Sequence, residues 1–211
     1  MAGKLITLEG IDGSGKSTQM RMLAGELRLR GHDVLTTMEP GGTPLGRSLR
    51  EAFLETEEQV SARAELLLFA ADRAQHIDFL IRPALKNEKI VISDRFADAT
   101  FAYQGAGRGF PSEVVNAVIE IATDGLKPDL TLFFDLPVER ALGRAESREI
   151  NNRMDSEGKE FYMRVRDAYL GIAEREPERF VVIPADRSRE EIHSRAVEVV
   201  AGFLGKQKKS A

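Results

Sequence analysis

The stretch Gly10-Ile11-Asp12-Gly13-Ser14-Gly15-Lys16-Ser17 is the most informative part of this sequence. It has the spacing G-x-x-x-x-G-K-[ST], it follows the strand-like run 4–9, and it opens a helical pattern from Lys16 to about Arg30. Glycines lack a Cβ atom, so the loop can turn successive N–H groups toward an anion, and the helix behind it adds its positive end. The stretch therefore predicts a loop that binds the phosphates of a nucleoside triphosphate.

The loop also indicates how ATP and a metal would be held. We expect the Lys16 ammonium group to reach the β- and γ-phosphates and the Ser17 hydroxyl group to hold Mg²⁺. An ordinary glycine turn is the alternative, but the strand before and the helix after the loop argue against it. The residues expected to bind ATP within the loop are Gly10, Ile11, Asp12, Gly13, Ser14, Gly15, Lys16, Ser17 and Thr18.

Composition limits the class of protein. The 211 residues show no composition break, so we expect a single domain over 1–211. The N-terminus lacks the layout of a signal peptide and no apolar run approaches a membrane span, which predicts a cytoplasmic protein without a membrane partner. The absence of cysteine excludes disulfides and thiolate metal sites, and a net charge of −4 argues against nucleic-acid binding. His32, His76 and His193 have no ligand spacing and are assigned no role.

Strand and helix patterns alternate along the whole chain. Strands are expected at 4–9, 32–38, 89–94, 129–135 and 179–183, and no pair is joined by a hairpin-length link. Helices are expected at 16–30, 45–55, 61–85, 111–123, from 138 onward, and at 156–175 and 188–203, with Pro83 kinking or ending the third. No element is predicted for 95–110. The pattern predicts an α/β fold with a parallel sheet covered by helices on both faces.

A phosphate-binding loop leaves the reaction open. A regulatory GTPase would carry an N-K-x-D guanine reader, and this sequence has none. A small-molecule kinase needs a second anion site and a basic lid, and the Arg-rich stretch 144–153 offers such a lid at about 143–155, expected to be exposed and mobile. An ATPase that acts as a partner-binding switch, hydrolysing ATP without regard to a small acceptor, remains an alternative.

Several motifs, in order and well spaced, resemble those of the bacterial thymidylate kinase family. They cover nearly the whole chain: Leu8-Glu9-Gly10, Glu39-Pro40-Gly41-Gly42-Thr43, Asp94-Arg95-Phe96, Ala102-Tyr103-Gln104-Gly105 and Pro128-Asp129-Leu130-Thr131-Leu132. The resemblance implies a P-loop nucleoside-monophosphate-kinase fold with sheet order 2-3-1-4-5. It further implies transfer of the ATP γ-phosphoryl group to dTMP, giving dTDP for dTTP synthesis, and a homodimer. A kinase for another nucleotide or a deoxynucleoside is the nearest alternative.

The phosphate-side residues follow from the reaction. The acceptor phosphate is already deprotonated, so the site needs cations and alignment more than a strong base. Arg95, directly after the strand ending at Asp94, is placed to bridge the two phosphates as the resemblance implies, with a structural ion pair as the alternative. Asp94 would order Mg²⁺ through water, or else cap a helix. The resemblance gives Asp12 a hydrogen bond from the sugar 3′-hydroxyl group.

The resemblance also suggests how the base is recognised. It implies that Phe69 stacks on the pyrimidine and that Arg73 donates to its O4 carbonyl, although periodicity alone makes Phe69 a core residue. Thr100 and Gln104, four residues apart, are candidates for N3 and the carbonyl edge. Tyr103 would crowd the sugar 2′ position, or simply pack in the core.

Other candidates carry specific alternatives. Glu39 is expected among the substrate-binding residues, and in a deoxynucleoside kinase it would have to be the general base. Met38 stands where many family members have an arginine, and Arg47 or Arg50 would compensate.

The remaining catalytic candidates are lid cations. Gly13 stands where some family members carry an arginine in the loop, and members without it place the catalytic cation in the lid. Arg148 is the first choice for that role and Arg153 the second, while Arg144 would stack on adenine; a solvated, charged helix end is the alternative. The residues expected to act in catalysis are thus Lys16, Arg95, Arg148, Asp12 and Arg153.

Overall fold

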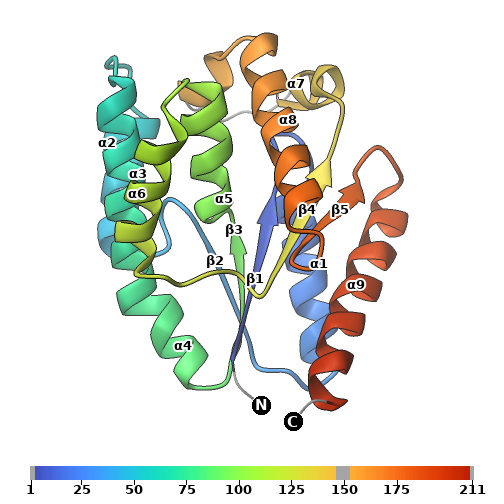
Figure 1. Ribbon diagram of the computed structural model, residues 1–211. Helices are drawn as coiled ribbons and strands as arrows, with labels where there is room; N and C mark the ends of the chain where they lie inside the picture. Colours follow the sequence, from blue (N-terminus) through green and yellow to red (C-terminus); the bar gives the residue numbers. More distant parts are fainter. Residues whose placement is uncertain (1–2, 146–152, 210–211) are drawn as a thin grey trace.

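The computed structural model, which describes residues 3–145 and 153–209, is built on a five-stranded parallel sheet (Figure 1). The strands are β1 (Lys4–Glu9), β2 (Val34–Met38), β3 (Ile90–Asp94), β4 (Leu130–Asp135) and β5 (Phe180–Pro184). Their order is β2-β3-β1-β4-β5, and every neighbouring pair is parallel. The fold class and the sheet order expected from the sequence are confirmed.

Strand register brings the predicted motifs to one edge of the sheet. Leu8 of β1 and Met38 of β2 both pair with Asp94 at the end of β3, and Glu9 pairs with Phe133 of β4. After β1 the chain connects to β2, beyond β3, while β4 and β5 lie on the other side of β1. Ligands in open α/β sheets bind at such a reversal, beyond the carboxyl ends of the strands. The loop after β1 begins at this point.

Helices cover the sheet on both faces (Figure 1). α1 and α9 pack against each other, α1 on β1 to β3 and α9 on β4 and β5, while α3, α6, η2 and α8 form a second layer. The helices are α1 (Lys16–Leu29), α2 (Pro44–Leu54), α3 (Ala62–His76), η1 (Ile77–Ile81), α4 (Arg82–Lys86), α5 (Ala97–Thr100), η2 (Phe101–Gly107), α6 (Ser112–Thr123), α7 (Val138–Ala145), η3 (Arg153–Ser156), α8 (Lys159–Arg175) and α9 (Arg189–Lys209).

Local sequence explains where two of these helices begin. The Thr43 side chain accepts a hydrogen bond from the Gly46 N–H group at 3.0 Å, and Pro44 occupies the first helical position of α2. The Ser61 hydroxyl group accepts from the Ala64 N–H group at 3.2 Å at the start of α3. Both caps satisfy backbone donors that a helix start leaves without partners.

Two expectations about helices need correction. The helix expected over 61–85 is α3, a π-helical turn η1, and α4, and the chain stays helical past Pro83. The π turn shifts the hydrogen-bond register just before Pro83, which has no N–H group to contribute. The segment 95–110, for which no element is predicted, contains α5 and η2. Its glycines and its π-helical geometry hide the usual helix period.

The core lies on both faces of the sheet because neighbouring strand residues point to opposite sides. Ile6 and Ile92 join the large cluster under α1, and Leu5 and Val91 join a second one. This second cluster includes Ile77 and other residues of η1 and α4. Within the described ranges no helix is long and apolar enough to cross a membrane.

Candidate active site

One cavity of about 530 Å³ collects most of the predicted site residues. It lies at the carboxyl edge of the sheet, between the loop after β1 and helices α3, α5 and η2. Gly10, Ile11, Ser14 and Arg153 are described but do not line it. The predicted residues that do line it are Asp12, Gly13, Gly15, Lys16, Ser17, Thr18, Glu39, Phe69, Arg73, Asp94, Arg95, Thr100, Tyr103, Gln104 and Arg144.

The loop has the backbone that its glycines predict. Gly10, Gly13 and Gly15 have φ angles of 146°, 84° and 92°, a region that side chains with a Cβ rarely adopt. The Lys16 ammonium group donates to the Gly10 carbonyl oxygen at 2.8 Å and to that of Ile11 at 3.1 Å. Burial, and next the Arg95 charge, lower the pKa of Lys16 to about 8. An anion in the loop would favour the charged lysine and raise this pKa.

Ser17 and Asp94 form a pair at the mouth of the loop. The Ser17 hydroxyl group donates to Asp94 Oδ2 at 2.8 Å, and both side chains line the cavity. A hydroxyl and a carboxylate oxygen are hard ligands that suit Mg²⁺, which binds proteins through one or two groups and takes its other ligands from phosphates and water. Helix α5 has no side-chain cap, so the alternative role of Asp94 as its cap is not observed.

Arg95 is held in an unusual backbone conformation. Its φ angle is 72°, and its N–H group donates to the Leu8 carbonyl oxygen at 2.9 Å. The guanidinium Nη2 donates to Asp12 Oδ1 at 3.1 Å and to the Tyr103 hydroxyl oxygen at 3.0 Å. Nη1 is buried and has no hydrogen-bond partner in the described parts of the chain. Arg95 therefore presents a fixed charge with a spare donor, which an anion would satisfy.

Arg73 is fixed on three sides. Its Nε donates to Glu39 Oε2 at 2.7 Å, Nη1 to Thr100 Oγ1 at 2.7 Å, and Nη2 to the Phe96 carbonyl oxygen at 3.0 Å. These contacts use three of its five N–H groups, so donors remain for a ligand. Because the guanidinium group is planar and anchored, its direction at the cavity wall is set before any ligand binds.

The Glu39 carboxylate is fully engaged. His76, to which the sequence assigns no role, hydrogen-bonds Glu39 Oε1 through Nδ1 at 2.9 Å and Thr37 Oγ1 through Nε2 at 2.6 Å. Burial alone would raise the pKa of Glu39, but Arg73 and His76 outweigh burial and hold this pKa below its usual value. A carboxylate with a lowered pKa and both oxygens occupied is a weak base.

Phe69 combines its two alternative roles. It is half-buried and its ring lies edge-on to Phe53, with centroids 4.9 Å apart, so it packs against the core. The same side chain lines the cavity one helical turn before Arg73. An aromatic face beside an anchored arginine suits a flat, polar ring.

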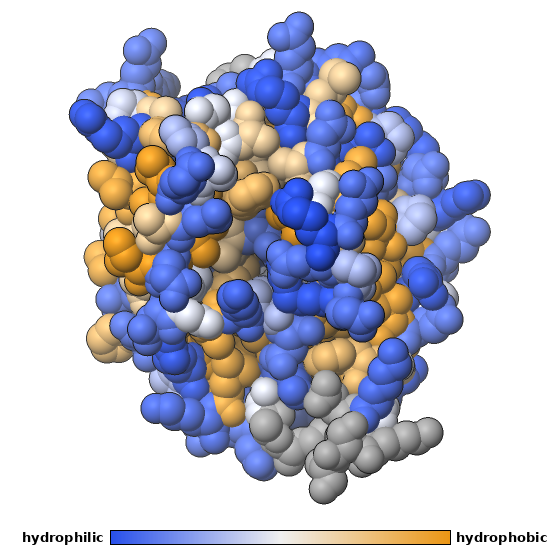
Figure 2. Space-filling view, viewed as in Figure 1, coloured by the Kyte–Doolittle hydropathy of each residue, from blue (hydrophilic) through white to orange (hydrophobic). Residues whose placement is uncertain are grey.

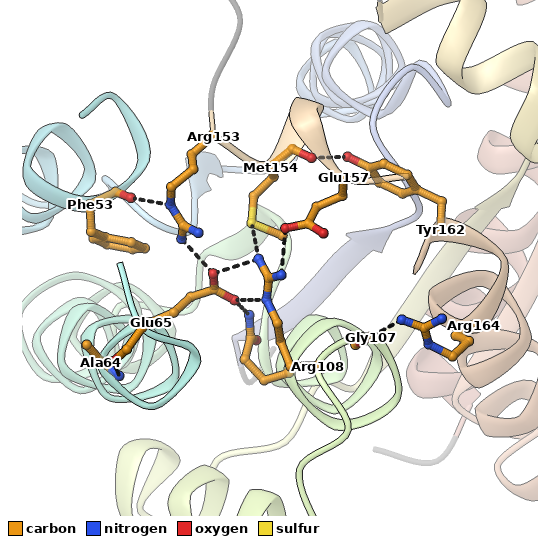
Figure 3. A network of polar contacts seen from close by, with 12 residues as sticks. Phe53, Ala64, Glu65, Gly107, Arg108, Arg153, Met154, Glu157, Tyr162 and Arg164 are labelled. Carbon is orange, nitrogen blue, oxygen red and sulfur yellow. Dashed lines mark hydrogen bonds and ion pairs between the residues drawn. The ribbon is translucent and has the colours of Figure 1, made fainter. Parts of the chain in front are cut away.

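Gln104 is held by Glu65 of α3. The Gln104 Nε2 group donates to Glu65 Oε1 at 2.9 Å, and both side chains are buried. Arg108 and Arg153 also donate to the Glu65 carboxylate, which connects α3, η2 and η3 (Figure 3).

Comparison with known proteins places this geometry in a family. A family model described as thymidylate kinase matches residues 8–196. A thymidylate kinase from Halothermothrix orenii is 50% identical over 207 residues, which cover 97% of this chain and 99% of that protein. The chain belongs to the thymidylate kinase family. A second thymidylate kinase, from Pseudomonas putida, is 49% identical and covers 97% of this chain and 98% of its own.

A solved structure agrees with this assignment. The crystal structure of thymidylate kinase from Ehrlichia chaffeensis superposes with a TM-score of 0.77 at 36% identity, over 94% of this chain and 98% of that chain. The resemblance stated from the motifs is confirmed. The roles of individual residues within the thymidylate kinase site remain predictions.

Gly13, where some thymidylate kinases carry a loop arginine, is in close contact with helix α7. A Cβ atom on Gly13 would lie 2.3 Å from the Ala141 carbonyl oxygen in α7, so this position has no room for a side chain. Arg144, on the same helix, donates to the Gly13 carbonyl oxygen at 3.3 Å. Any additional cation must therefore come from outside the loop. Arg148, the first choice, lies outside the described residues.

Arg153 lies on the other side of that undescribed segment. It donates to Glu65 and, at 3.1 Å, to the Phe53 carbonyl oxygen, and its side chain is only 17% exposed. The expectation of an exposed stretch over 144–153 is therefore wrong for Arg153. The Glu65 carboxylate, which the sequence reading does not use, binds the Arg153 guanidinium group. The role of Arg153 as a second catalytic cation stays a prediction.

Met38 stands where many family members have an arginine, and Arg50 is better placed than Arg47 to compensate for its absence. Met38 is 46% exposed and lines the cavity, as does Arg50. Arg50 Nη1 donates to the Pro40 carbonyl oxygen at 3.3 Å, and its Nε pairs with Glu55 at 3.1 Å. Arg47 is exposed and does not line the cavity. Of the two predicted substitutes, only Arg50 is in a position to act.

Glu65 and His76 are two buried polar residues near the cavity that sequence reasoning missed. One signal was available: Glu65, Phe69 and Arg73 follow each other at intervals of four residues, so all three share one face of α3. An acidic residue on a helix face that is otherwise buried requires a partner. His76, three residues after Arg73, has the same kind of position.

Proposed function

We propose that this chain transfers the γ-phosphoryl group of ATP to dTMP, forming dTDP for dTTP synthesis in the cytoplasm. One observation supports the proposal beyond family membership: a single cavity is lined by Lys16 of the phosphate-binding loop, by Phe69 and Arg73 of α3, and by Gln104 of η2. Such a cavity suits a nucleoside monophosphate, whose base would contact the last three of these residues while its phosphate faces the loop.

The residues on the base side match a thymine ring. Phe69 would stack on the ring, and the remaining donors of Arg73 would bind the O4 carbonyl group. Gln104 and Thr100 would bind N3 and the carbonyl edge. Tyr103, fixed by its contact with Arg95, would lie near the sugar 2′ position and favour deoxyribose.

The residues on the phosphate side would neutralise and align charge. Lys16 would bind the phosphates of ATP, and Arg95 would use its free Nη1 to bridge donor and acceptor. Asp12, hydrogen-bonded to Arg95, would accept from the sugar 3′-hydroxyl group. Arg148 would add the lid cation, Arg153 is its alternative, and Arg144 would stack on adenine.

Magnesium belongs to the proposal as the ion that accompanies ATP. Ser17 and Asp94 would hold it, directly or through water, and it would neutralise charge on the phosphates. Within the described residues no three His, Cys, Asp or Glu side chains gather as a metal site. A Mg²⁺ ion ligated mainly by phosphate and water does not require such a cluster.

Two alternatives are less consistent with the site. A deoxynucleoside kinase would need Glu39 as its base, but both oxygens of that carboxylate are engaged and its pKa is lowered. An ATPase switch gives no reason for Phe69, Arg73 and Gln104 to share the ATP cavity.

A homodimer is the second part of the proposal. Large apolar side chains are exposed on neighbouring elements: Leu67 of α3 (56%), Phe79 of η1 (70%), and Val114 (44%) and Ile121 (82%) of α6. Figure 2 shows apolar side chains gathered on the flank where α3 and α6 lie in Figure 1. Exposed apolar side chains gathered on one flank are typical of a protein interface.

The test is ADP formation by purified protein with ATP and Mg²⁺ across a panel of acceptors. We expect a strong signal with dTMP, a weaker one with dUMP, and near-background signals with dCMP, UMP, AMP, thymidine and no acceptor. A signal with thymidine alone would favour the deoxynucleoside kinase. A signal that does not depend on the acceptor would favour the ATPase switch.

A further inference from the structure

Glu65 is a fully buried carboxylate with four donors around it. Oε1 accepts from Gln104 Nε2 at 2.9 Å and from Arg108 Nε at 3.1 Å, while Oε2 accepts from Arg108 Nη2 at 2.9 Å and from Arg153 Nη2. Figure 3 shows the two arginines converging on this one carboxylate. Burial alone would raise the pKa of Glu65, but Arg108, Gln104 and Arg153 outweigh burial and keep it lowered. The group is therefore ionised and accepts hydrogen bonds only.

An acceptor-only partner fixes which way the Gln104 amide points. Only the NH₂ end of an amide can donate to a carboxylate, so the opposite orientation would place two oxygen atoms together. Gln104 also lines the cavity, and in the described parts of the chain its Oε1 accepts no hydrogen bond. The amide therefore has its NH₂ end on Glu65 and its carbonyl oxygen available to a ligand.

This direction distinguishes two kinds of pyrimidine. Thymine and uracil carry a hydrogen on N3 and a carbonyl oxygen at position 4, whereas cytosine has an acceptor at N3 and an amino donor at position 4. Arg73 has only donors and the available end of Gln104 is an acceptor, so together they complement the first pattern. With cytosine, the Gln104 carbonyl oxygen would face the N3 acceptor, and Arg73 would face the 4-amino donor.

We infer that Glu65 is a positioning residue that sets base selectivity by holding the Gln104 carbonyl oxygen toward the N3–H group of the acceptor base. This inference rests on the proposed dTMP kinase function. Glu65 does not touch the substrate and acts through Gln104. The same carboxylate, through Arg108 and Arg153, fixes the start of η3 to the helix that carries Phe69 and Arg73.

The decisive variant is Glu65→Gln, which has nearly the same shape but carries one donor end. Its carbonyl oxygen is expected to take the Oε2 position, where two guanidinium donors meet, leaving its NH₂ end toward Gln104. The Gln104 amide then has to turn, and its NH₂ end faces the cavity. We expect the ratio of kcat/KM for dTMP to that for dCMP to fall about 10- to 100-fold, mainly through KM.

Two controls separate positioning from general damage. Glu157→Gln makes the same chemical change on the other side of Arg108, with which Glu157 forms an ion pair, and should leave the ratio unchanged. Glu65→Gln in a Gln104→Leu background should not change the ratio further, because the residue through which Glu65 acts is gone. A similar fall in ratio in either control would overturn the inference.

The failure of this inference can be told from failure of the proposed function. No dTMP-dependent ADP formation in the wild type would reject both, whereas normal wild-type activity with an unchanged ratio in Glu65→Gln would reject the inference alone. If Glu65→Gln does not fold, wild-type NMR decides. The N3 imino proton of bound dTMP should lie downfield, as expected for a proton donated to a carbonyl oxygen, and should lose that position in Gln104→Leu. An N3 imino proton with the same shift in both proteins would overturn the inference.

Discussion

The Glu9 carboxyl group, at the end of β1, has a buried environment that favours its neutral form. Oε1 accepts from the Phe96 N–H group at 2.8 Å, and Oε2 is hydrogen-bonded to the Tyr169 hydroxyl group at 2.7 Å. Burial first, and the Asp98 charge second, raise the pKa of Glu9 to about 8. The folded protein therefore holds a proton that the unfolded chain releases near the ordinary value of 4.5.

This raised pKa predicts how stability depends on pH. Between pH 4.5 and 8 the folded state binds the extra proton, so the Glu9 contribution to the free energy of unfolding falls as pH rises, by up to about 1.4 kcal/mol per unit. Glu9→Gln keeps an acceptor for Phe96 and offers a donor to Tyr169. Urea unfolding at pH 5, 6.5 and 8 should show a shallower decline for this variant. Equal slopes in the two proteins would contradict the prediction.

The limits of sequence reasoning at the residue scale have a physical cause. Lys16 and Ser17 were predictable because their spacing from the loop glycines fixes their chemistry. Glu65 and His76 were not, because their partners lie 39 and 37 residues away, at Gln104 and Glu39. A partner of that kind is brought close only by the packing of α3 on the rest of the fold.

At the scale of elements, the contact between the phosphate-binding loop and α7 leaves no room for a side chain at Gly13. Gly13→Ala would place a Cβ atom 2.3 Å from the Ala141 carbonyl oxygen and would put alanine at a φ of 84°. The backbone conformation alone costs about 1–2 kcal/mol. Because α7 and Arg144 must also move, we expect turnover with dTMP to fall at least about tenfold, a barrier change of about 1.4 kcal/mol.

Gly25→Ala in α1 is the matched control for Gly13→Ala. A Cβ atom on Gly25 meets nothing within 4 Å, and its φ angle is that of an ordinary helix. Alanine there should stabilise the protein by up to about 1 kcal/mol and leave turnover unchanged. Steady-state kinetics and thermal unfolding of both variants check this contrast. Wild-type turnover in Gly13→Ala would show that α7 adapts at little cost.

Elements differ in how well their sequences reveal them. The strands are short apolar runs whose parallel arrangement follows from the helices between them, so the sheet could be predicted. The π-helical turns η1 and η2 could not, because they depart from the 3.6-residue period that sequence patterns report. Tyr103 and Gln104 of η2 line the cavity, within a segment for which no helix was predicted.

At the scale of the whole molecule, the flank formed by α3, η1 and α6 exposes the apolar side chains that the proposed homodimer would bury. Ile121 is 82% exposed, and it follows Val114 on the same face of α6 at a spacing of two helical turns. An exposed residue contributes little to the stability of one chain, so a charge there should not unfold the protein. In a dimer, however, the charge would be buried against apolar surface, at a cost of several kcal/mol.

Ile121→Asp should therefore convert a dimer into monomers without loss of fold. Light scattering after size-exclusion chromatography would measure the mass, and circular dichroism would confirm the fold. Leu29→Asp is the matched control, since Leu29 is 87% exposed on α1, away from this flank, and its variant should keep the wild-type mass. A monomeric wild type would reject the homodimer, and a dimeric Ile121→Asp would place the interface elsewhere. Because α3 carries Phe69 and Arg73 on one face and Leu67 on another, loss of the dimer should also weaken dTMP binding more than turnover.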